Sequence, residues 1–190
     1  MLDREDSEYF KRYVETRNLT DRIQTYWRVD QGDAQQLKQI VRTEFGDSLD
    51  LVVDDASHQY ELTKSSFSTL FPMLRPGGLY IIEDWAWAHW PGWQASDHPW
   101  AHNVELTRLI FDIVEAIGTS PEMIHSLLVF QGFAVIERGP AVVDPGTVIC
   151  LEDQILRRPQ WAALDQQNNQ PGDQKKDQRA KGIFSRLIRK

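Results

Sequence analysis

Two apolar segments that each stop at a pair of carboxylates constrain the fold of this chain most strongly. The first, Leu51-Val52-Val53, ends at Asp54-Asp55, and the second, Leu79-Tyr80-Ile81-Ile82, ends at Glu83-Asp84. Continuous apolar runs are typical of buried parallel strands, and a helix-sized segment separates these two. The pattern therefore predicts a strand, a crossover helix and a second strand, joined in the right-handed sense of an α/β fold.

The surrounding segments predict the remaining elements. Apolar residues recur at helical spacing over 60–74, and Pro76-Gly77-Gly78 is expected to end that helix and start the next strand. We also expect amphipathic helices over 7–18, after Gly32 and over 104–117, a strand over 21–29, and a hairpin formed by 125–130 and 133–137. The expected fold is an α/β domain with a mostly parallel sheet and a C-terminal antiparallel hairpin.

Length and charge limit the domain organisation and the partners. The 190 residues suffice for one domain, expected over 1–162, followed by a tail over 163–190. That tail is rich in Gln, Asn and Lys and poor in apolar residues, so it is expected to be disordered, with a short basic amphipathic segment at its end. The net charge of −7 argues against nucleic acid as the main partner.

Cysteine content and hydropathy indicate the compartment. Cys150 is the only cysteine, which excludes an internal disulfide and a multi-thiolate metal site. No stretch of the sequence reaches membrane-spanning length, and the first residues lack the basic and apolar regions of a signal peptide. We therefore expect a soluble protein of the cytoplasm.

The carboxylate pairs predict a site at one edge of the sheet. The carboxyl ends of neighbouring parallel strands meet there, so Asp55, Glu83 and Asp84 should converge with His58. Carboxylates are hard oxygen ligands suited to Mg²⁺, and an imidazole beside such an ion is a candidate general base. The alternative is that Asp54 or Asp55 caps the following helix and His58 packs on it, which leaves Glu83 and Asp84 without a role.

The stretch 50–87, with its motifs DDASH and IIED, resembles class I S-adenosylmethionine-dependent methyltransferases that O-methylate sugars on macrolides and related natural products. Weaker similarity extends over QGDAQQL upstream and QGFAVIERGP downstream. The resemblance implies a Rossmann-like fold, S-adenosylmethionine and Mg²⁺ as cofactors, and a sugar or polyol hydroxyl as acceptor. It implies Asp55, Glu83 and Asp84 as Mg²⁺ ligands and His58 as the catalytic base.

The same resemblance implies cofactor and substrate contacts. Asp33 would lie at the adenine end of the cofactor, although it also suits the N-cap of the following helix, and one residue can fill both roles. Asp54 would belong to the cofactor-binding residues. In the aromatic segment 85–100, Trp87 and Trp90 are the candidates for contact with a sugar, whereas the competing interpretation is that these rings cover the core or a subunit interface.

One departure from the family affects every functional prediction. These methyltransferases begin with a strand and a glycine-rich turn that approaches the cofactor, but the first glycine here is Gly32. The chain is therefore expected to be an N-terminally truncated, incomplete fold. A truncated reading frame, completion by a second copy or another chain, and a degenerate relative all remain open. An O-methyltransferase is the leading function, and a non-catalytic partner or pseudoenzyme and a metal-dependent hydrolase are the alternatives.

Overall fold

A computed structural model describes residues 7–144 and 146–159 of the chain. The chain divides after Leu156 into two units, and the elements described here belong to the first. The predicted tail over 163–190, with its basic end, lies outside the described residues. No helix within the described ranges is long and apolar enough to cross a membrane.

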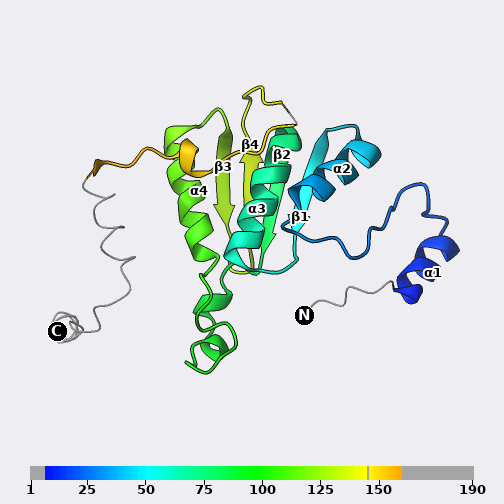
Figure 1. The fold of residues 1–190 in the computed structure, drawn as a ribbon, viewed down its shortest axis with the longest axis horizontal. Coiled ribbons are helices and arrows are strands. Elements are labelled where there is room, and N and C mark those ends of the chain that lie inside the picture. Colours follow the sequence, from blue (N-terminus) through cyan, green and yellow to red (C-terminus); the bar gives the residue numbers. More distant parts are fainter. Residues whose placement is uncertain (1–6, 145, 160–190) are drawn as a thin grey trace. The chain divides into compact units, whose positions relative to one another are not determined.

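One mixed sheet forms the centre of this unit (Figure 1). Its strands are β1 Leu49–Asp54, β2 Leu74–Glu83, β3 Ile124–Val129 and β4 Phe133–Arg138, in the order β1-β2-β4-β3. β1 and β2 are parallel, whereas β4 is antiparallel to both β2 and β3. The α/β class and the hairpin are confirmed. The sheet is mixed rather than mostly parallel, because the second hairpin strand pairs with β2 and creates a second antiparallel interface.

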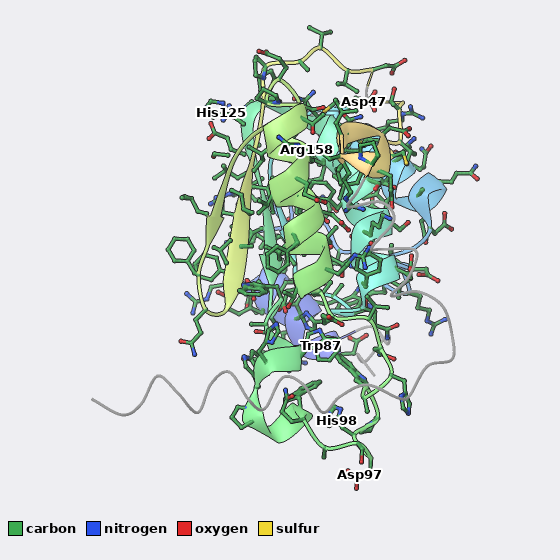
Figure 2. All side chains as sticks on the ribbon, turned by 90° about the vertical axis from the view of Figure 1, so that its left-hand side faces the viewer. Asp47, Trp87, Asp97, His98, His125 and Arg158 are labelled. Atoms are coloured by element: carbon green, nitrogen blue, oxygen red, sulfur yellow. The ribbon has the colours of Figure 1, made fainter. Side chains whose placement is uncertain are left out.

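Each helix that the apolar spacing predicted is present. The α-helices of the described residues are α1 Glu8–Thr16, α2 Ala34–Phe45, α3 Tyr60–Leu70 and α4 Thr107–Thr119. α2 begins at Asp33, whose carboxylate accepts hydrogen bonds from the backbone N–H groups of Gln35 and Gln36. It ends at Gly46 in the left-handed conformation, with φ of 61°, which glycine adopts at little cost. Figures 1 and 2 show α3 and α4 over the same face of the sheet.

The unit β1–α3–β2 is the one that the two apolar segments predicted, but its second strand starts earlier. β2 begins at Leu74, so Pro76-Gly77-Gly78 lies inside the strand instead of before it. A Cβ at Gly78 would lie 2.9 Å from the carbonyl oxygen of Arg75 and 3.2 Å from that of Asp50. Only glycine allows β1 and β2 to approach this closely.

The two faces of the sheet differ in burial. Toward the helices, Tyr80 and Ile82 are fully buried, and the ring of Phe67 from α3 lies edge-on 5.1 Å from that of Tyr80. On the opposite face Leu51 and Val53 are 51% and 50% exposed. The described part of the chain therefore covers the helix-facing side of the sheet and leaves an apolar face open.

The predicted strand over 21–29 is wrong. The structure has turns, a bend and irregular backbone there. A strand is stable only where a neighbour accepts and donates its backbone hydrogen bonds. Among the described residues the sheet ends at β1, and its free edge is not paired with 21–29. The alternation of apolar and polar residues over 21–29 favours a strand, but it does not show whether a neighbouring strand is present to pair with it.

Candidate metal centre

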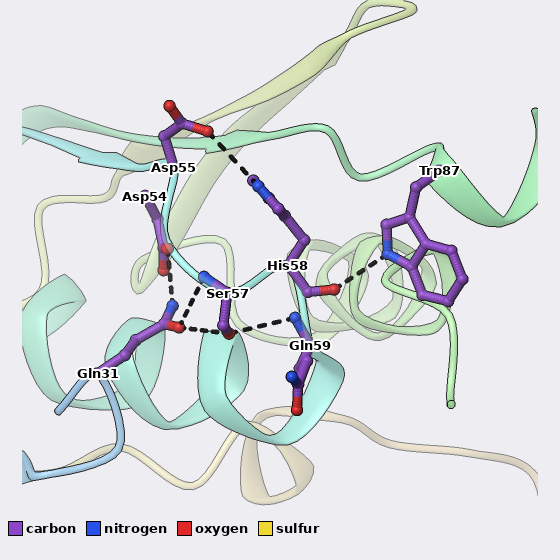
Figure 3. Close-up of polar contacts among 7 residues, drawn as sticks. All are labelled: Gln31, Asp54, Asp55, Ser57, His58, Gln59 and Trp87. Carbon is purple, nitrogen blue, oxygen red and sulfur yellow. Dashed lines mark hydrogen bonds and ion pairs between the residues drawn. The ribbon is translucent and has the colours of Figure 1, made fainter. Parts of the chain in front are cut away.

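The loop after β1 places a carboxylate and an imidazole together. Nε2 of His58 lies 3.6 Å from Oδ1 of Asp55, as Figure 3 shows. The backbone of His58 is left-handed, with φ of 54°. Nε1 of Trp87 donates a 3.0 Å hydrogen bond to the carbonyl oxygen of His58, which helps to hold this unusual conformation.

Asp84 brings a second carboxylate from the end of β2. Its backbone is also left-handed, with φ of 49°, and its N–H donates to the carbonyl oxygen of Gly132 at 2.7 Å. The β3–β4 turn thus fixes the position of Asp84. Ligand atoms of Asp55, His58 and Asp84 all lie within 4.8 Å of one another. The structure brings these three predicted site residues together at the edge where β1 and β2 end.

The donor set fits a divalent cation. Asp55 and Asp84 provide hard carboxylate oxygens, which Mg²⁺ prefers, and the open side of the group leaves room for the waters that Mg²⁺ usually keeps. Left-handed residues other than glycine cost about 1–3 kcal/mol each and concentrate at functional sites. Asp and His tolerate this conformation better than most residues. Two of the five left-handed residues other than glycine among the described residues, His58 and Asp84, belong to this three-residue group.

Glu83 is not a member of this group. It is the last residue of β2 and is paired in register with Phe133 of β4. Because side chains alternate along a strand, Glu83 leaves the sheet on the side opposite to the buried Ile82. Its role as a third metal ligand remains a prediction.

Asp54 is buried beneath the loop instead of lying on its surface. The carboxylate is 7% exposed and accepts hydrogen bonds from Ser66 Oγ at 2.5 Å, Tyr80 Oη at 2.7 Å and Gln31 Nε2 at 2.7 Å. Burial, and then the Asp54 carboxylate, raise the pKa of Tyr80 well above 10.0, so its hydroxyl remains a donor at neutral pH. The structure gives Asp54 an anchoring position, and its predicted contact with the cofactor stays a prediction.

Asp33 caps α2, as the sequence allowed. It also lines an open cavity of about 560 Å³, together with Tyr26, Gln35, Gln36, Gln39 and Ile40. The cap and a ligand contact are compatible, because the cap uses Oδ1 for both backbone hydrogen bonds. The predicted contact with adenine remains a prediction.

The aromatic segment after Asp84 forms a cluster of tilted and edge-on rings. Trp87 is 4% exposed, and its ring centroid lies 5.1 Å from that of Trp100 and 5.6 Å from that of Trp93. These three rings line a cavity of about 290 Å³. Trp90 packs against Trp93 at 6.0 Å and does not line this cavity. Figure 2 shows the segment extending from Trp87 to His98.

Sequence reasoning missed three residues that contact the site or its neighbouring cavity. Trp93 and Trp100 line the aromatic cavity, but nothing in the sequence separates them from the other tryptophans. Gln31 contacts Asp54 and Ser57, which are 23 and 26 positions away along the chain. Its only sequence signal was its place beside the GD segment.

Residues 2–85, which include both carboxylate pairs, match the family model described as a methyltransferase domain. The chain is 36% identical over 103 residues to demethylmacrocin O-methyltransferase from Streptomyces fradiae, a match that covers 47% of this chain. It is 35% identical over 123 residues, or 58% of this chain, to mycinamicin VI 2''-O-methyltransferase from Micromonospora griseorubida. Over this part of its length the chain is similar to methyltransferases. The resemblance that the DDASH and IIED motifs indicated is thereby confirmed.

The similarity extends over a limited part of each relative. The chain spans 26% of the length of the demethylmacrocin enzyme and 30% of that of the mycinamicin enzyme. A solved structure of the MycE methyltransferase in complex with Mg, SAH and mycinamycin VI is 36% identical, and the match covers 58% of this chain and 30% of that one, with a TM-score of 0.47. The chain therefore corresponds to less than a third of these relatives.

Proposed function

We propose that this chain carries the metal and base portion of an O-methyltransferase site, which transfers a methyl group from S-adenosylmethionine to a sugar or polyol hydroxyl. The observation that carries the proposal is the group of Asp55, His58 and Asp84, with ligand atoms within 4.8 Å of one another. The named relatives support it, since they are O-methyltransferases of macrolides, and MycE was solved with Mg and SAH.

Each residue of the group has a role in this chemistry. His58 takes the proton of the acceptor hydroxyl, and Asp55, 3.6 Å away, stabilises the imidazolium that forms. Asp55 and Asp84 would hold Mg²⁺, with Glu83 as a further expected ligand. Bound there, the cation would supply positive charge that makes the acceptor hydroxyl easier to deprotonate. The acceptor oxygen bonds to the methyl carbon as the sulfur–carbon bond breaks, and the sulfonium becomes the thioether of S-adenosylhomocysteine.

The expected substrate and cofactor contacts follow from the neighbouring cavities. Trp87, with Trp93 and Trp100, presents aromatic surface to a cavity of about 290 Å³, which suits the apolar face of a sugar ring. Trp90 packs edge-on against Trp93, with 6.0 Å between the ring centroids. Asp33 lies on the open cavity beside α2, and Asp54 lies below the site, where we expect them to bind or support the cofactor.

Calorimetry tests the proposal directly. Titration of MgCl₂, and then of S-adenosylhomocysteine, into the folded chain should give saturable heats. Asp84→Asn should weaken Mg²⁺ binding by about tenfold or more, because it removes a charged oxygen ligand. Asp97→Asn is the matched control, since Asp97 is exposed in the aromatic segment and outside the three-residue group. A folded wild-type chain that takes up neither ligand would contradict an active enzyme.

The open apolar face of the sheet favours one alternative function, a non-catalytic methyltransferase-like subunit. Leu51 and Val53 are about half exposed, as are Leu128 and Phe130 near the other edge. Contiguous exposed apolar surface often marks a protein interface. This alternative predicts concentration-dependent association in sedimentation velocity, and a strictly monomeric chain that binds Mg²⁺ and cofactor would exclude it.

A further inference from the structure

Gln31 connects the buried end of β1 with the loop that carries His58. Its Nε2 donates to Oδ1 of Asp54 at 2.7 Å. Its Oε1 accepts from the hydroxyl of Ser57 at 2.6 Å and from the backbone N–H of Ser57 at 3.2 Å. The hydroxyl oxygen of Ser57 in turn accepts from the N–H of Gln59 at 3.3 Å. Figure 3 shows these hydrogen bonds at Ser57 and Gln59, the residues directly before and after His58 in the chain.

The anchoring end of this network is rigid. Asp54 is 7% exposed, and its second carboxylate oxygen accepts from Ser66 and Tyr80. Both donors lie on elements of the core, Ser66 on α3 and Tyr80 on β2, and both are buried. A buried carboxylate with this many donors has little freedom to move, because losing any one of them leaves charge unsatisfied.

The backbone that carries Gln31 is also held against the core. At the next residue, Gly32, a Cβ would lie 3.0 Å from Cδ2 of Leu62 on α3, so the loop passes close to that helix. The carbonyl oxygen of Gly32 accepts from Ser65 Oγ at 3.4 Å, and the cap at Asp33 follows immediately. The backbone that carries Gln31 is therefore held in place by contacts with α3 and by the start of α2.

The chemistry of the position requires an amide. Toward Asp54 the side chain must donate, and toward Ser57 it must accept from both an N–H and an O–H. A carboxylate at this position would face the Asp54 carboxylate without a donor. A shorter or apolar side chain would leave Ser57 and its N–H without this partner.

We propose that Gln31 is a positioning residue of the metal site. Its hydrogen bonds to buried Asp54 and to Ser57 hold Ser57 in place. Ser57 in turn holds His58 in the left-handed conformation that directs its ring toward Asp55. The expected effect on metal affinity rests on the proposed function. The hydrogen bonds of Gln31 with Asp54 and Ser57 do not depend on that function. His58 is then restrained at three points, by Ser57 before it, by Gln59 after it and by Trp87 on its carbonyl oxygen.

Two measurements on the full chain test the proposal. In Gln31→Met, which keeps the side-chain length but removes both polar contacts, the Ser57 amide should exchange with solvent deuterium about 5- to 10-fold faster, as expected for one lost hydrogen bond. Exchange at Ile82 in the core reports global opening and serves as the reference. Electron paramagnetic resonance of added Mn²⁺ should show metal affinity reduced by a similar factor.

Tyr80→Phe is the matched control, because it also removes a donor to Asp54 but leaves the contacts of Gln31 with Asp54 and Ser57 in place. It should lower stability while leaving Ser57 exchange, relative to Ile82, and Mn²⁺ affinity unchanged. Should Gln31→Met fail to fold, Ser57→Ala removes the hydroxyl contact from the partly exposed loop side and should weaken Mn²⁺ binding to a similar extent.

The outcomes separate this inference from the proposed function. Faster Ser57 exchange in Gln31→Met together with weaker Mn²⁺ binding supports the inference. Unchanged Ser57 exchange, or losses no larger than those of Tyr80→Phe, overturns it. If the wild-type chain binds no Mn²⁺ but Ser57 exchange still responds to Gln31→Met, the loop contact is supported and the proposed metal function fails.

Discussion

At the scale of single residues, His58 and Asp84 show how two neighbouring strand ends can hold reactive groups in a strained backbone. Both have positive φ, and each is held by a hydrogen bond from or to a different part of the chain, Trp87 for His58 and Gly132 for Asp84. Pre-arranged side chains lower the cost of orientation when substrate and ion bind. The left-handed conformations of these two residues are thus stabilised by contacts with Trp87 and Gly132.

Replacement of His58, the proposed base, should remove the proposed methyl transfer with little effect on folding. We expect His58→Gln to reduce methyl transfer by about 10²–10⁴-fold, the usual contribution of a general base. The loss should appear mainly in kcat, measured by release of S-adenosylhomocysteine, with the melting temperature nearly unchanged. His125→Gln is the control, because His125 is an exposed histidine on β3 and lies outside the three-residue group. Equal loss in both variants would contradict the role of His58.

Tyr80 should make stability depend on alkaline pH. Its folded-state pKa is raised above 10.0 by burial and by Asp54, so folding favours the protonated hydroxyl. This contribution is fully present below about pH 10, the unfolded pKa, and is lost as the pH rises through the folded pKa. The free energy of unfolding from urea titrations should therefore fall above pH 10. Tyr80→Phe should flatten but not abolish that slope, because burial and Asp112 raise the pKa of Tyr60 as well. An unchanged slope would contradict the assignment.

At the scale of elements, the β1–α3–β2 unit could be predicted from sequence because its apolar runs, helix period and carboxylate ends all agree. The strand over 21–29 could not, because pairing depends on a neighbour that local alternation does not reveal. Glu83 and Asp84 looked equivalent in sequence, yet strand alternation and the turn at Asp84 separate them. The role of Gln31 could not be predicted from the sequence, because its partners Asp54 and Ser57 are distant in the chain. Local sequence patterns thus predicted the residues at the ends of β1 and β2. The contacts that hold these residues in place depend on the tertiary structure.

The contact between β1 and β2 depends on Gly78. Gly78→Ala would place a methyl group 3.2 Å from the carbonyl oxygen of Asp50 in β1 and 2.9 Å from that of Arg75 in β2, and the overpacking should cost about 1–3 kcal/mol of unfolding free energy. Gly118→Ala in α4 is the matched control, because the added methyl group would have no described atom within 4 Å beyond its chain neighbours and its own helix backbone. That change should be neutral or stabilise by up to about 1 kcal/mol. Chemical denaturation of both variants measures the difference, and equal stabilities would contradict the close approach of the strands.

At the scale of the whole molecule, the described residues form a sheet with helices on one face and an open apolar face on the other. β1 is apolar on both sides and yet is an edge strand within the described chain. Natural edge strands usually carry charges, prolines or bulges that block further pairing. This contrast is the physical reason for considering both an enzyme and an interacting subunit.

The open face should bind a hydrophobic dye. We expect 8-anilinonaphthalene-1-sulfonate fluorescence to rise with the folded chain and to fall in the double variant Leu51→Thr and Val53→Thr, which keeps strand propensity but removes apolar surface. Val142→Thr is the control, because Val142 is a fully exposed valine in a loop. Dye binding that is absent, or unaffected by the double variant, would show that this face is covered.

The central claim, that Asp55, His58 and Asp84 surround one divalent cation, is tested most directly by anomalous X-ray diffraction from crystals of the chain grown with Mn²⁺. The account predicts one anomalous peak within coordination distance of the carboxylates of Asp55 and Asp84, with the His58 ring beside it. Side chains that diverge at this edge, with no peak between them in a site free of crystal contacts, would contradict it.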